Sequence, residues 1–311
     1  MKTIFVSIAS YRDPELVPTV EDCLAHATYP ERLRFGICRQ GASDEPPLPW
    51  TGDPRFRILD VDWRSARGVC WARAQIMEQY DGETYFLQLD SHHRFVQGWD
   101  ERAVAQLLLA GGPKPVLTTY GTPYDPKTPD IRSSIPMQMN FDRFTDAGIP
   151  IFRPGQLRGW PAGHRPTRSR FISAHFLLTI GAFVREVPYD PSIYFVGEEI
   201  TLAVRAFTHG YELFHPSDVI VWHEYTREYR PHKHWTDHVE ANGVAVPWHQ
   251  RELVSLAAVR TILLDARIGV LGLGTDRTLA DYERYAGLDF RSAEADARAL
   301  GHEEPPDLRA R

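Results

Sequence analysis

The segment Tyr85-Phe86-Leu87-Gln88-Leu89-Asp90-Ser91-His92-His93-Arg94 passes from an apolar run into an acid, a hydroxyl, two imidazoles and a cation. A short apolar run of this kind predicts a buried strand, and the polar residues follow its carboxyl end. In extended chain, residues i and i+2 point to the same side, so Asp90 and His92 can face one point. Open α/β sheets bind ligands at this edge. A carboxylate and a neutral imidazole there predict a divalent metal of the Mn or Zn type, which could hold a phosphate.

The chain around this segment alternates between short apolar runs and stretches with helical spacing. Such alternation predicts an α/β fold with a largely parallel central sheet covered by helices on both faces. Strands are predicted at 3–8, 33–38, 55–62, 85–90 and 115–119, and helices at 15–27, 67–80 and 98–110.

The second half of the chain begins with a region that has no clear period. Residues 120–170 are rich in Pro and Gly and contain several aromatic residues, which predicts loops over the open end of the sheet. These loops could form a wall of a binding site or be a variable surface insertion. Further strands are predicted at 211–215 and 218–222, the second leading to His223, and helices at 200–209, 251–264, 279–286 and 293–300. We expect a catalytic domain over 1–240, with halves at 1–119 and 120–240, and a helical C-terminal extension over 241–311 packed on it.

Composition limits the classes of function. The 311 residues are 43% hydrophobic and 24% charged, which is typical of a globular protein and excludes a disordered chain. The net charge of −6 disfavours non-specific binding to nucleic acid. Three scattered cysteines without a C-x-x-C pair indicate a reducing compartment. No apolar run approaches the roughly 20 residues of a membrane span, so we expect a cytoplasmic protein without a membrane partner. The oligomeric state stays open.

Several other residues are candidates for chemistry, each with an ordinary alternative. Asp90 could cap a helix, with His92 as a satisfied polar contact. His223 follows a short apolar strand and is a candidate third metal ligand. Glu198 and Glu199 could be paired acid/base carboxylates or an acidic first turn of a helix. A basic, aromatic segment could cover a diphosphate or be a solvated turn; it contains Arg227, Arg230, His232, Lys233, His234 and Trp235. The chain lacks the dinucleotide-binding, P-loop, hydrolase-elbow and H-E-x-x-H patterns.

Taken together, ordered motifs carry a resemblance to a known family. They are S-I-A-S-Y-R-D-P (7–14), G-V-C-W-A-R (68–73), Y-F-L-Q-L-D-S-H-H-R-F (85–95), E-V-P-Y-D-P (186–191), V-G-E-E-I (196–200), T-H-G-Y (208–211), V-W-H (221–223) and G-L-G-T-D-R-T-L-A-D-Y-E (272–283). The chain resembles the GlcNAc-type glycosyltransferases, which include cytosolic protein-hydroxyproline N-acetylglucosaminyltransferases. It is more distantly similar to the polypeptide GalNAc transferases with their D-x-H metal motif. The resemblance spans residues 3 to 290.

The resemblance implies a GT-A glycosyltransferase fold, a UDP-sugar donor, with UDP-GlcNAc as the first choice, and Mn²⁺, Mg²⁺ or another divalent ion. It also implies roles for residues of this chain. Asp90, His92 and His223 would bind the metal, and Glu198 or Glu199 would contact the sugar or the acceptor hydroxyl as catalytic residues. The nucleotide-sugar would be bound by Ser10, Tyr11, Arg12, Asp13, Gln40, Arg73, Ser91, Arg230, His232, His234 and Trp235.

The implied activity is transfer of a sugar to an acceptor hydroxyl with retention of anomeric configuration. The acceptor could be a protein, a saccharide or a small molecule. A metal-dependent nucleotide-sugar hydrolase and a non-catalytic UDP-sugar or glycan-binding protein remain as alternatives. Strand alternation predicts that His93 points away from the metal and is structural.

Overall fold

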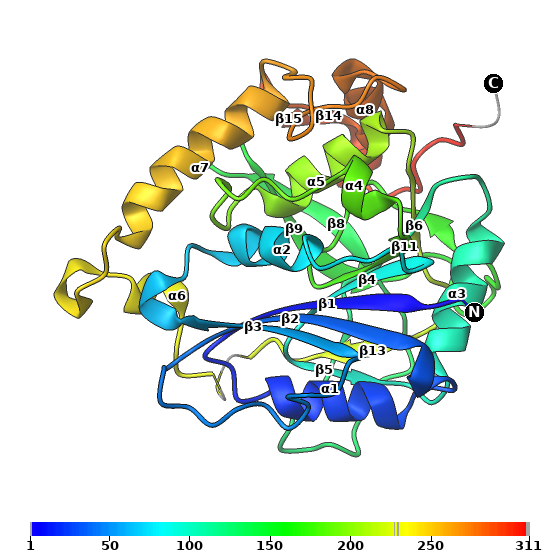
Figure 1. The fold of residues 1–311 in the computed structure, drawn as a ribbon. Coiled ribbons are helices and arrows are strands. Elements are labelled where there is room, and N and C mark those ends of the chain that lie inside the picture. Colours follow the sequence, from blue (N-terminus) through cyan, green and yellow to red (C-terminus); the bar gives the residue numbers. More distant parts are fainter. Residues whose placement is uncertain (1, 227, 229, 309–311) are drawn as a thin grey trace.

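The computed structural model describes residues 2–226, 228 and 230–308, and its centre is a twisted eight-stranded sheet (Figure 1). The strand order is β10-β12-β6-β11-β4-β1-β2-β3, and β11 and β10 run antiparallel to their neighbours. The α/β class and the mostly parallel sheet are therefore confirmed. The strands are β1 (Ile4–Tyr11), β2 (Leu33–Gly41), β3 (Phe56–Asp62), β4 (Tyr85–Asp90), β6 (Pro115–Thr118), β10 (Thr167–Arg168), β11 (Phe176–Ile180) and β12 (Glu212–His215).

Helices cover both faces of this sheet (Figure 1). The helices α1 (Leu16–Ala25) and α3 (Trp99–Ala110) lie on one face, and α2 (Val69–Met77), α4 (Phe183–Glu186) and α5 (Glu198–Thr208) on the other. Alternation along β4 explains how one strand serves both faces. Leu87 packs with the apolar residues of α1 and α3, whereas Phe86 packs with those of α2 and α4. Strand β4 is thus buried on both faces; Gln88 inside it is buried and donates to the Ala174 carbonyl and the Tyr189 hydroxyl, and the charged Asp90 stands at its end.

The C-terminal helices extend the core on the α5 side. Helix α7 (Trp248–Leu263) and helix α8 (Leu279–Ala286) both contact α5, and their buried residues Val259, Tyr282 and Tyr285 join the same apolar cluster as α5. The remaining short elements are α6 (His234–Asp237), α9 (Ala297–Leu300), β14 (Leu288–Asp289), β15 (Glu294–Ala295) and the 3-10 helices η1 (Pro30–Arg32), η2 (Trp63–Ser65) and η3 (Glu240–Asn242). Among the described residues, none of the helices combines the length and the apolar character needed to cross a bilayer.

The expectation of loops throughout residues 120–170 is wrong for part of this region. Strands β8 (Met137–Phe144) and β9 (Pro150–Gln156) form an antiparallel hairpin. Two prolines in β9 conceal it in the sequence, because proline is normally a sign against a strand. In a two-stranded ribbon each strand has one unpaired edge, where a residue without an N–H group is tolerated. Met139 and Phe141 bury their side chains in the core and hold the hairpin in place.

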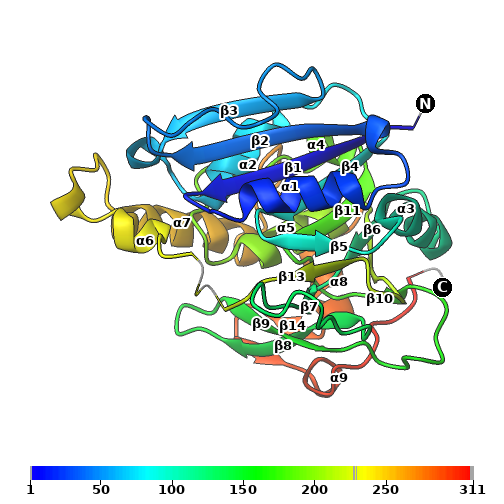
Figure 2. The same cartoon turned by 90° about the horizontal axis from the view of Figure 1, so that it is seen from below.

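A second, three-stranded sheet positions the polar residues that follow β4. Its order is β5 (His93–Phe95), β13 (Val221–His223) and β7 (Thr122–Pro123). Figure 2 shows this sheet between the central sheet and the β8–β9 hairpin. Because β13 and β5 are antiparallel with His223 opposite His93, the small sheet brings His223 to the carboxyl end of β4.

Candidate metal centre and active site

Asp90, His92 and His223 lie together, although 130 residues or more separate His223 from the other two along the chain. The Asp90 Oδ2 atom is 3.6 Å from His92 Nε2 and 3.7 Å from His223 Nε2. These separations are too long for hydrogen bonds. They match ligands that surround one ion at about 2.1 Å, whose atoms are roughly 3 to 4 Å apart. Within the described residues, the buried ring nitrogens of His223 have no hydrogen-bond partner. The residues therefore fit a divalent metal.

The orientation of His92 is set by Asp13, in the loop between β1 and α1. The Asp13 Oδ2 atom is 2.8 Å from His92 Nδ1 and accepts a hydrogen bond of 2.7 Å from Ser91 Oγ. A carboxylate on one ring nitrogen fixes the tautomer of a metal-binding histidine, so that the other nitrogen offers its lone pair to the ion. Here that nitrogen is Nε2, which faces Asp90. Asp13 also lines the cavity of about 250 Å³ beside Asp90 and His92 that is described below, and its contact with a nucleotide stays a prediction.

The charge of Asp90 is held by its surroundings. Burial raises the pKa of its carboxyl, but His223 and Arg73 outweigh this and hold the pKa well below its usual range. The buried Arg73 donates a 2.6 Å hydrogen bond to Asp90 and is also 3.2 Å from Glu198. Asp90 is therefore ionised at neutral pH, as a metal ligand must be. Arg73 also donates to the Ala174 carbonyl and to the Tyr189 hydroxyl, so both of its terminal nitrogens have partners within the protein.

Glu198 and Glu199 begin helix α5, as the sequence predicts. Burial raises the pKa of Glu198 against the opposing effect of Arg73. Glu199 accepts hydrogen bonds of 2.9 Å from Tyr120 Oη and from the Ala174 N–H. Burial raises the pKa of Glu199 to about 7, although both hydrogen bonds lower it. Glu199 therefore changes charge near neutral pH, which is a property typical of groups that exchange protons in active sites.

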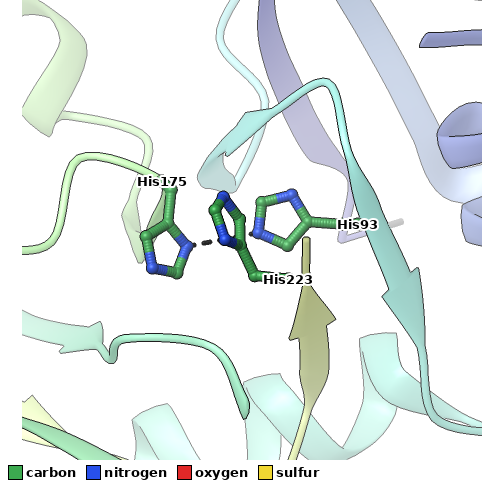
Figure 3. Close-up of side chains that lie close together, drawn as sticks. All are labelled: His93, His175 and His223. Carbon is green, nitrogen blue, oxygen red and sulfur yellow. Dashed lines mark hydrogen bonds between the residues drawn. The ribbon is translucent and has the colours of Figure 1, made fainter. Parts of the chain in front are cut away.

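A second group of imidazoles adjoins the first and includes His93. Figure 3 shows that the rings of His93, His175 and His223 lie close together, with His93 hydrogen-bonded to His175. The ring centroid of His93 is 4.8 Å from that of His223. The prediction that His93 points away from the metal residues is therefore wrong. Alternation holds only in extended chain, and residues 91 and 92 form a bend between β4 and β5.

A cavity of about 250 Å³ opens beside Asp90 and His92 and contains many of the predicted nucleotide-sugar residues. They are Tyr11, Asp13, Gln40, Ser91, Arg230, His232, His234 and Trp235. The structure places Ser10 and Arg12 beside a different cavity, and Arg73 beside a third one. Arg12 and the Tyr11 hydroxyl both donate to Asp237, at 2.8 and 3.1 Å.

The basic segment after β13 folds back over this cavity. Arg230 forms an ion pair of 2.9 Å with the buried Glu224, and its Nη1 atom is 3.0 Å from His92 Nε2. Burial lowers the pKa of His234 to about 3, so that this imidazole is neutral at pH 7. Its Nδ1 atom lies 2.8 Å from the Tyr194 hydroxyl. Arg230 and Lys233 therefore supply the positive charge of the segment on the cavity side. Arg227 lies outside the described residues.

Sequence reasoning missed several aromatic residues of the site. Tyr194, Phe195 and Tyr225 line the cavity, and Tyr120 and His175 line an adjoining one of about 430 Å³ that also contains Asp90, Glu198 and Glu199. Tyr120 could have been found, because it follows the end of strand β6 by two residues. His175 precedes its strand, so the strand-end rule does not point to it.

Comparisons with known proteins agree with this architecture. The family model described as "Glycosyltransferase (GlcNAc)" matches residues 3–51 and 50–292. The structure of GalNAc-T7 with UDP, GalNAc and Mn²⁺ is similar, with a TM-score of 0.62 and 13% identity over 91% of this chain and 50% of that one. This chain thus spans half the length of GalNAc-T7.

Two structures of S. aureus TarS residues 1–349 align less well. One has a TM-score of 0.48 and 9% identity over 84% of this chain and 72% of that one. The other, in complex with UDP-GlcNAc, has a TM-score of 0.46 and 10% identity over 84% and 73%. A search of curated proteins finds no match. Because the family match extends over nearly the whole chain and the fold agrees with it, the chain belongs to the glycosyltransferase (GlcNAc) family of enzymes and has the GT-A fold.

Proposed function

We propose that this enzyme transfers a sugar, with GlcNAc as the first choice, from a UDP-sugar to an acceptor hydroxyl, with Mn²⁺ or a related divalent ion held by Asp90, His92 and His223. The observation that carries the proposal is the pair of unpartnered ring nitrogens of His223, found among the described residues beside the ionised Asp90. The cavity next to them is lined by Arg230 and Lys233, whose positive charges suit a diphosphate. When bound, the ion supplies positive charge for the diphosphate.

The residues of the chain divide the work of binding the donor. Tyr11 and Gln40, opposite each other in the neighbouring parallel strands β1 and β2, line the cavity and would contact the uridine half. Arg230, whose Nη1 atom is 3.0 Å from His92 Nε2, and Lys233 line the cavity and would contact the diphosphate. Negative charge develops on the departing UDP as the bond to the sugar breaks, and these two cations stabilise it. Asp13, 2.8 Å from Nδ1 of His92, would leave Nε2 of the same ring available to bind the ion.

The acceptor would enter through the adjoining cavity, which meets the first at Asp90, His223 and Tyr225. One wall is formed by β9 residues, including Pro150 and Phe152, and the floor contains Glu199. We propose that ionised Glu199 accepts a hydrogen bond from the acceptor hydroxyl. The expected product is α-linked, formed by attack on the same face from which UDP leaves. A β-linked product in an NMR analysis would contradict this stereochemistry.

Calorimetric titration of UDP-GlcNAc, UDP-GalNAc and UDP-glucose, each with Mn²⁺ or with EDTA, tests the donor and the metal. We expect that one of the three donors binds tightly in the presence of Mn²⁺ and that this binding is lost in EDTA. The Asp90→Ala and His92→Ala variants should lose Mn²⁺-dependent release of UDP while keeping the circular-dichroism spectrum of the native protein. The exposed His249→Ala variant is the control and should behave like the unmodified enzyme. Unchanged turnover in both site variants would refute the metal assignment, and free sugar released at full rate without acceptor would indicate a hydrolase.

A further inference from the structure

His175 and His93 are two buried histidines that the proposed reaction does not use directly. His93 is 0% exposed and His175 is 6% exposed. His93 begins β5, immediately after the bend that carries His92, whereas His175 immediately precedes β11. Two imidazoles removed from water need defined hydrogen-bond partners, since an unsatisfied ring nitrogen would be costly. The hydrogen-bond partners of His93 and His175 show which parts of the metal site the two rings support.

Hydrogen bonds fix the tautomers of both rings from opposite ends. Both the Gly121 N–H and the Tyr225 hydroxyl oxygen lie 3.2 Å from His175 Nε2, and the Tyr225 hydroxyl donates to the Gly121 carbonyl. Because the backbone N–H can only donate, we assign His175 Nε2 as unprotonated. The proton of His175 is then on Nδ1, which is 3.2 Å from His93 Nε2 and donates to it. At the other end, His93 Nδ1 is 3.0 Å from the carbonyl oxygen of Asp90, which can only accept. The Gly121 N–H at one end and the Asp90 carbonyl at the other both require that His175 Nδ1 donates to His93 Nε2. Both rings are therefore neutral and carry their proton on Nδ1.

The direction of the hydrogen bond from His175 Nδ1 to His93 Nε2 also decides between two groups of residues that could hold a metal. His93, His175 and His223 are close enough to bind one ion, and so are Asp90, His92 and His223. In the first group, however, His93 Nε2 accepts a hydrogen bond and His175 Nδ1 donates it, so neither atom offers a free lone pair. In the second group the facing atoms are not hydrogen-bonded to one another, and the contact of 3.0 Å at His92 Nε2 comes from Arg230, on the basic segment that covers the cavity, and not from another member of the group. The pair is therefore a support beside the metal residues and not a second metal centre.

The pair contacts two of the three metal residues. Through its hydrogen bond to the Asp90 carbonyl, His93 holds the end of β4 from which the Asp90 carboxylate projects. The ring of His175 stacks on that of His223, with centroids 4.1 Å apart and planes at 28°. A metal-binding histidine usually donates its second N–H to a carboxylate or a carbonyl, which fixes the ring. Because His223 has no such partner among the described residues, ring packing must fix its orientation.

We propose that His175 and His93 are positioning residues, which together hold the backbone of Asp90 and the ring of His223 in the geometry that binds the divalent ion. This inference rests on the proposed metal site. Loss of a group that orients metal ligands typically weakens metal binding roughly 10- to 100-fold. We therefore expect the dissociation constant for Mn²⁺ to rise by about this factor when either the hydrogen bonds of the pair or the stacking of His175 on His223 is removed.

Two substitutions separate the hydrogen bonds from the stacking. His175→Phe keeps a ring against His223 but cannot accept from Gly121 or donate to His93. His175→Gln lacks the ring but has an amide oxygen and an amide nitrogen that can replace both hydrogen bonds. Mn²⁺ binding is measured without donor or acceptor, by calorimetry and by loss of the free-ion EPR signal. We expect both variants to bind Mn²⁺ at least 10-fold more weakly, while UDP binding in EDTA is unchanged.

His215→Gln is the matched control, because His215 is also buried and neutral but donates to the Thr118 carbonyl beside another cavity. It should lower the melting temperature without changing the Mn²⁺ dissociation constant. A purely structural role of His175 would give the same pattern in its variants, and Mn²⁺ binding within twofold of the unmodified protein in both would refute the proposal. In the same titration Asp90→Asn tests the metal site itself. Unchanged Mn²⁺ binding in Asp90→Asn would overturn the site and the supporting role, whereas loss in Asp90→Asn alone would overturn only the inference.

One measurement needs no variant and so does not depend on whether the variants fold. Long-range ¹⁵N–¹H correlation spectra of the unmodified protein at pH 7 report which nitrogen of each imidazole carries the proton. We expect His93 and His175 both as neutral rings protonated on Nδ1. A proton on Nε2 of either ring, or a doubly protonated ring, is incompatible with the hydrogen bonds from Gly121 to His175 and from His175 to His93, and would refute the proposal.

Discussion

Replacement of Glu199 by Gln tests whether this carboxyl changes charge near neutral pH. Burial raises the pKa of Glu199 in the folded protein from its ordinary value of 4.5 to about 7. Below pH 4.5 the group is protonated in both the folded and the unfolded state. As the pH rises toward 7 the unfolded chain releases the proton while the folded protein retains it, so folding loses stability. Gln has the shape of the protonated acid but cannot ionise, so the stability of Glu199→Gln should not decrease in this way as the pH rises.

The size of the effect follows from the two pKa values. A folded pKa of about 7 against an unfolded pKa of 4.5 corresponds to about 3.4 kcal/mol at pH 8. The side chain keeps some contact with solvent, which screens its interactions, and we therefore expect about 2 kcal/mol. The Gln amide can accept from the Ala174 N–H and donate to the Tyr120 hydroxyl oxygen, which retains both contacts. At pH 5 the two proteins should therefore be nearly equal in stability.

The assay is urea unfolding of the metal-free proteins at pH 5 and pH 8. The free energy of unfolding of Glu199→Gln minus that of the unmodified protein should increase by about 2 kcal/mol between these pH values. Glu101→Gln, at an exposed position in the first turn of α3, is the control and should show no comparable increase. A difference that is the same at both pH values, or that decreases toward pH 8, would show that the pKa of Glu199 is not raised.

Three further substitutions test contacts around the metal residues. Asp13→Asn should weaken Mn²⁺ binding roughly 10- to 100-fold in calorimetry, because the carboxylate orients His92, and an unchanged affinity would refute that role. Arg230→Met removes the guanidinium that lies 2.9 Å from the buried carboxylate of Glu224 and should lower the free energy of unfolding by about 2 to 4 kcal/mol in urea; the double variant with Glu224→Gln should recover part of this loss, and a single variant as stable as the unmodified protein would contradict the importance of this ion pair. Thr19→Val removes the hydroxyl that accepts from the His93 N–H and donates to the Ser91 carbonyl; it should cost about 1 to 3 kcal/mol of unfolding free energy, and a loss below about 0.5 kcal/mol, as expected for an exposed site, would count against it.

Local patterns in the sequence were enough to predict most of the fold. Strands β1, β4 and β6 are largely apolar runs followed by polar residues, β2 and β3 have apolar residues among charged ones, and the helices between them show helical spacing, so local patterns predict these elements. The sequence did not predict the β8–β9 hairpin, because its prolines are tolerated at the free edge of a two-stranded ribbon, and the sequence does not show which strand edges are free.

The chemistry of the candidate site divides in the same way. The sequence alone placed Asp90 and His92 at the end of a buried strand, and its ordered motifs indicated the family and the third histidine. Only the tertiary structure decided that Asp13 orients His92, that Glu224 pairs with Arg230, and that His93 faces inward to meet His175. The pairs of Asp13 with His92 and of His93 with His175 join residues about 80 positions apart. Pairing between β5 and β13, packing of α1 against the bend after β4, and burial of the rings set these contacts, and no local period records them.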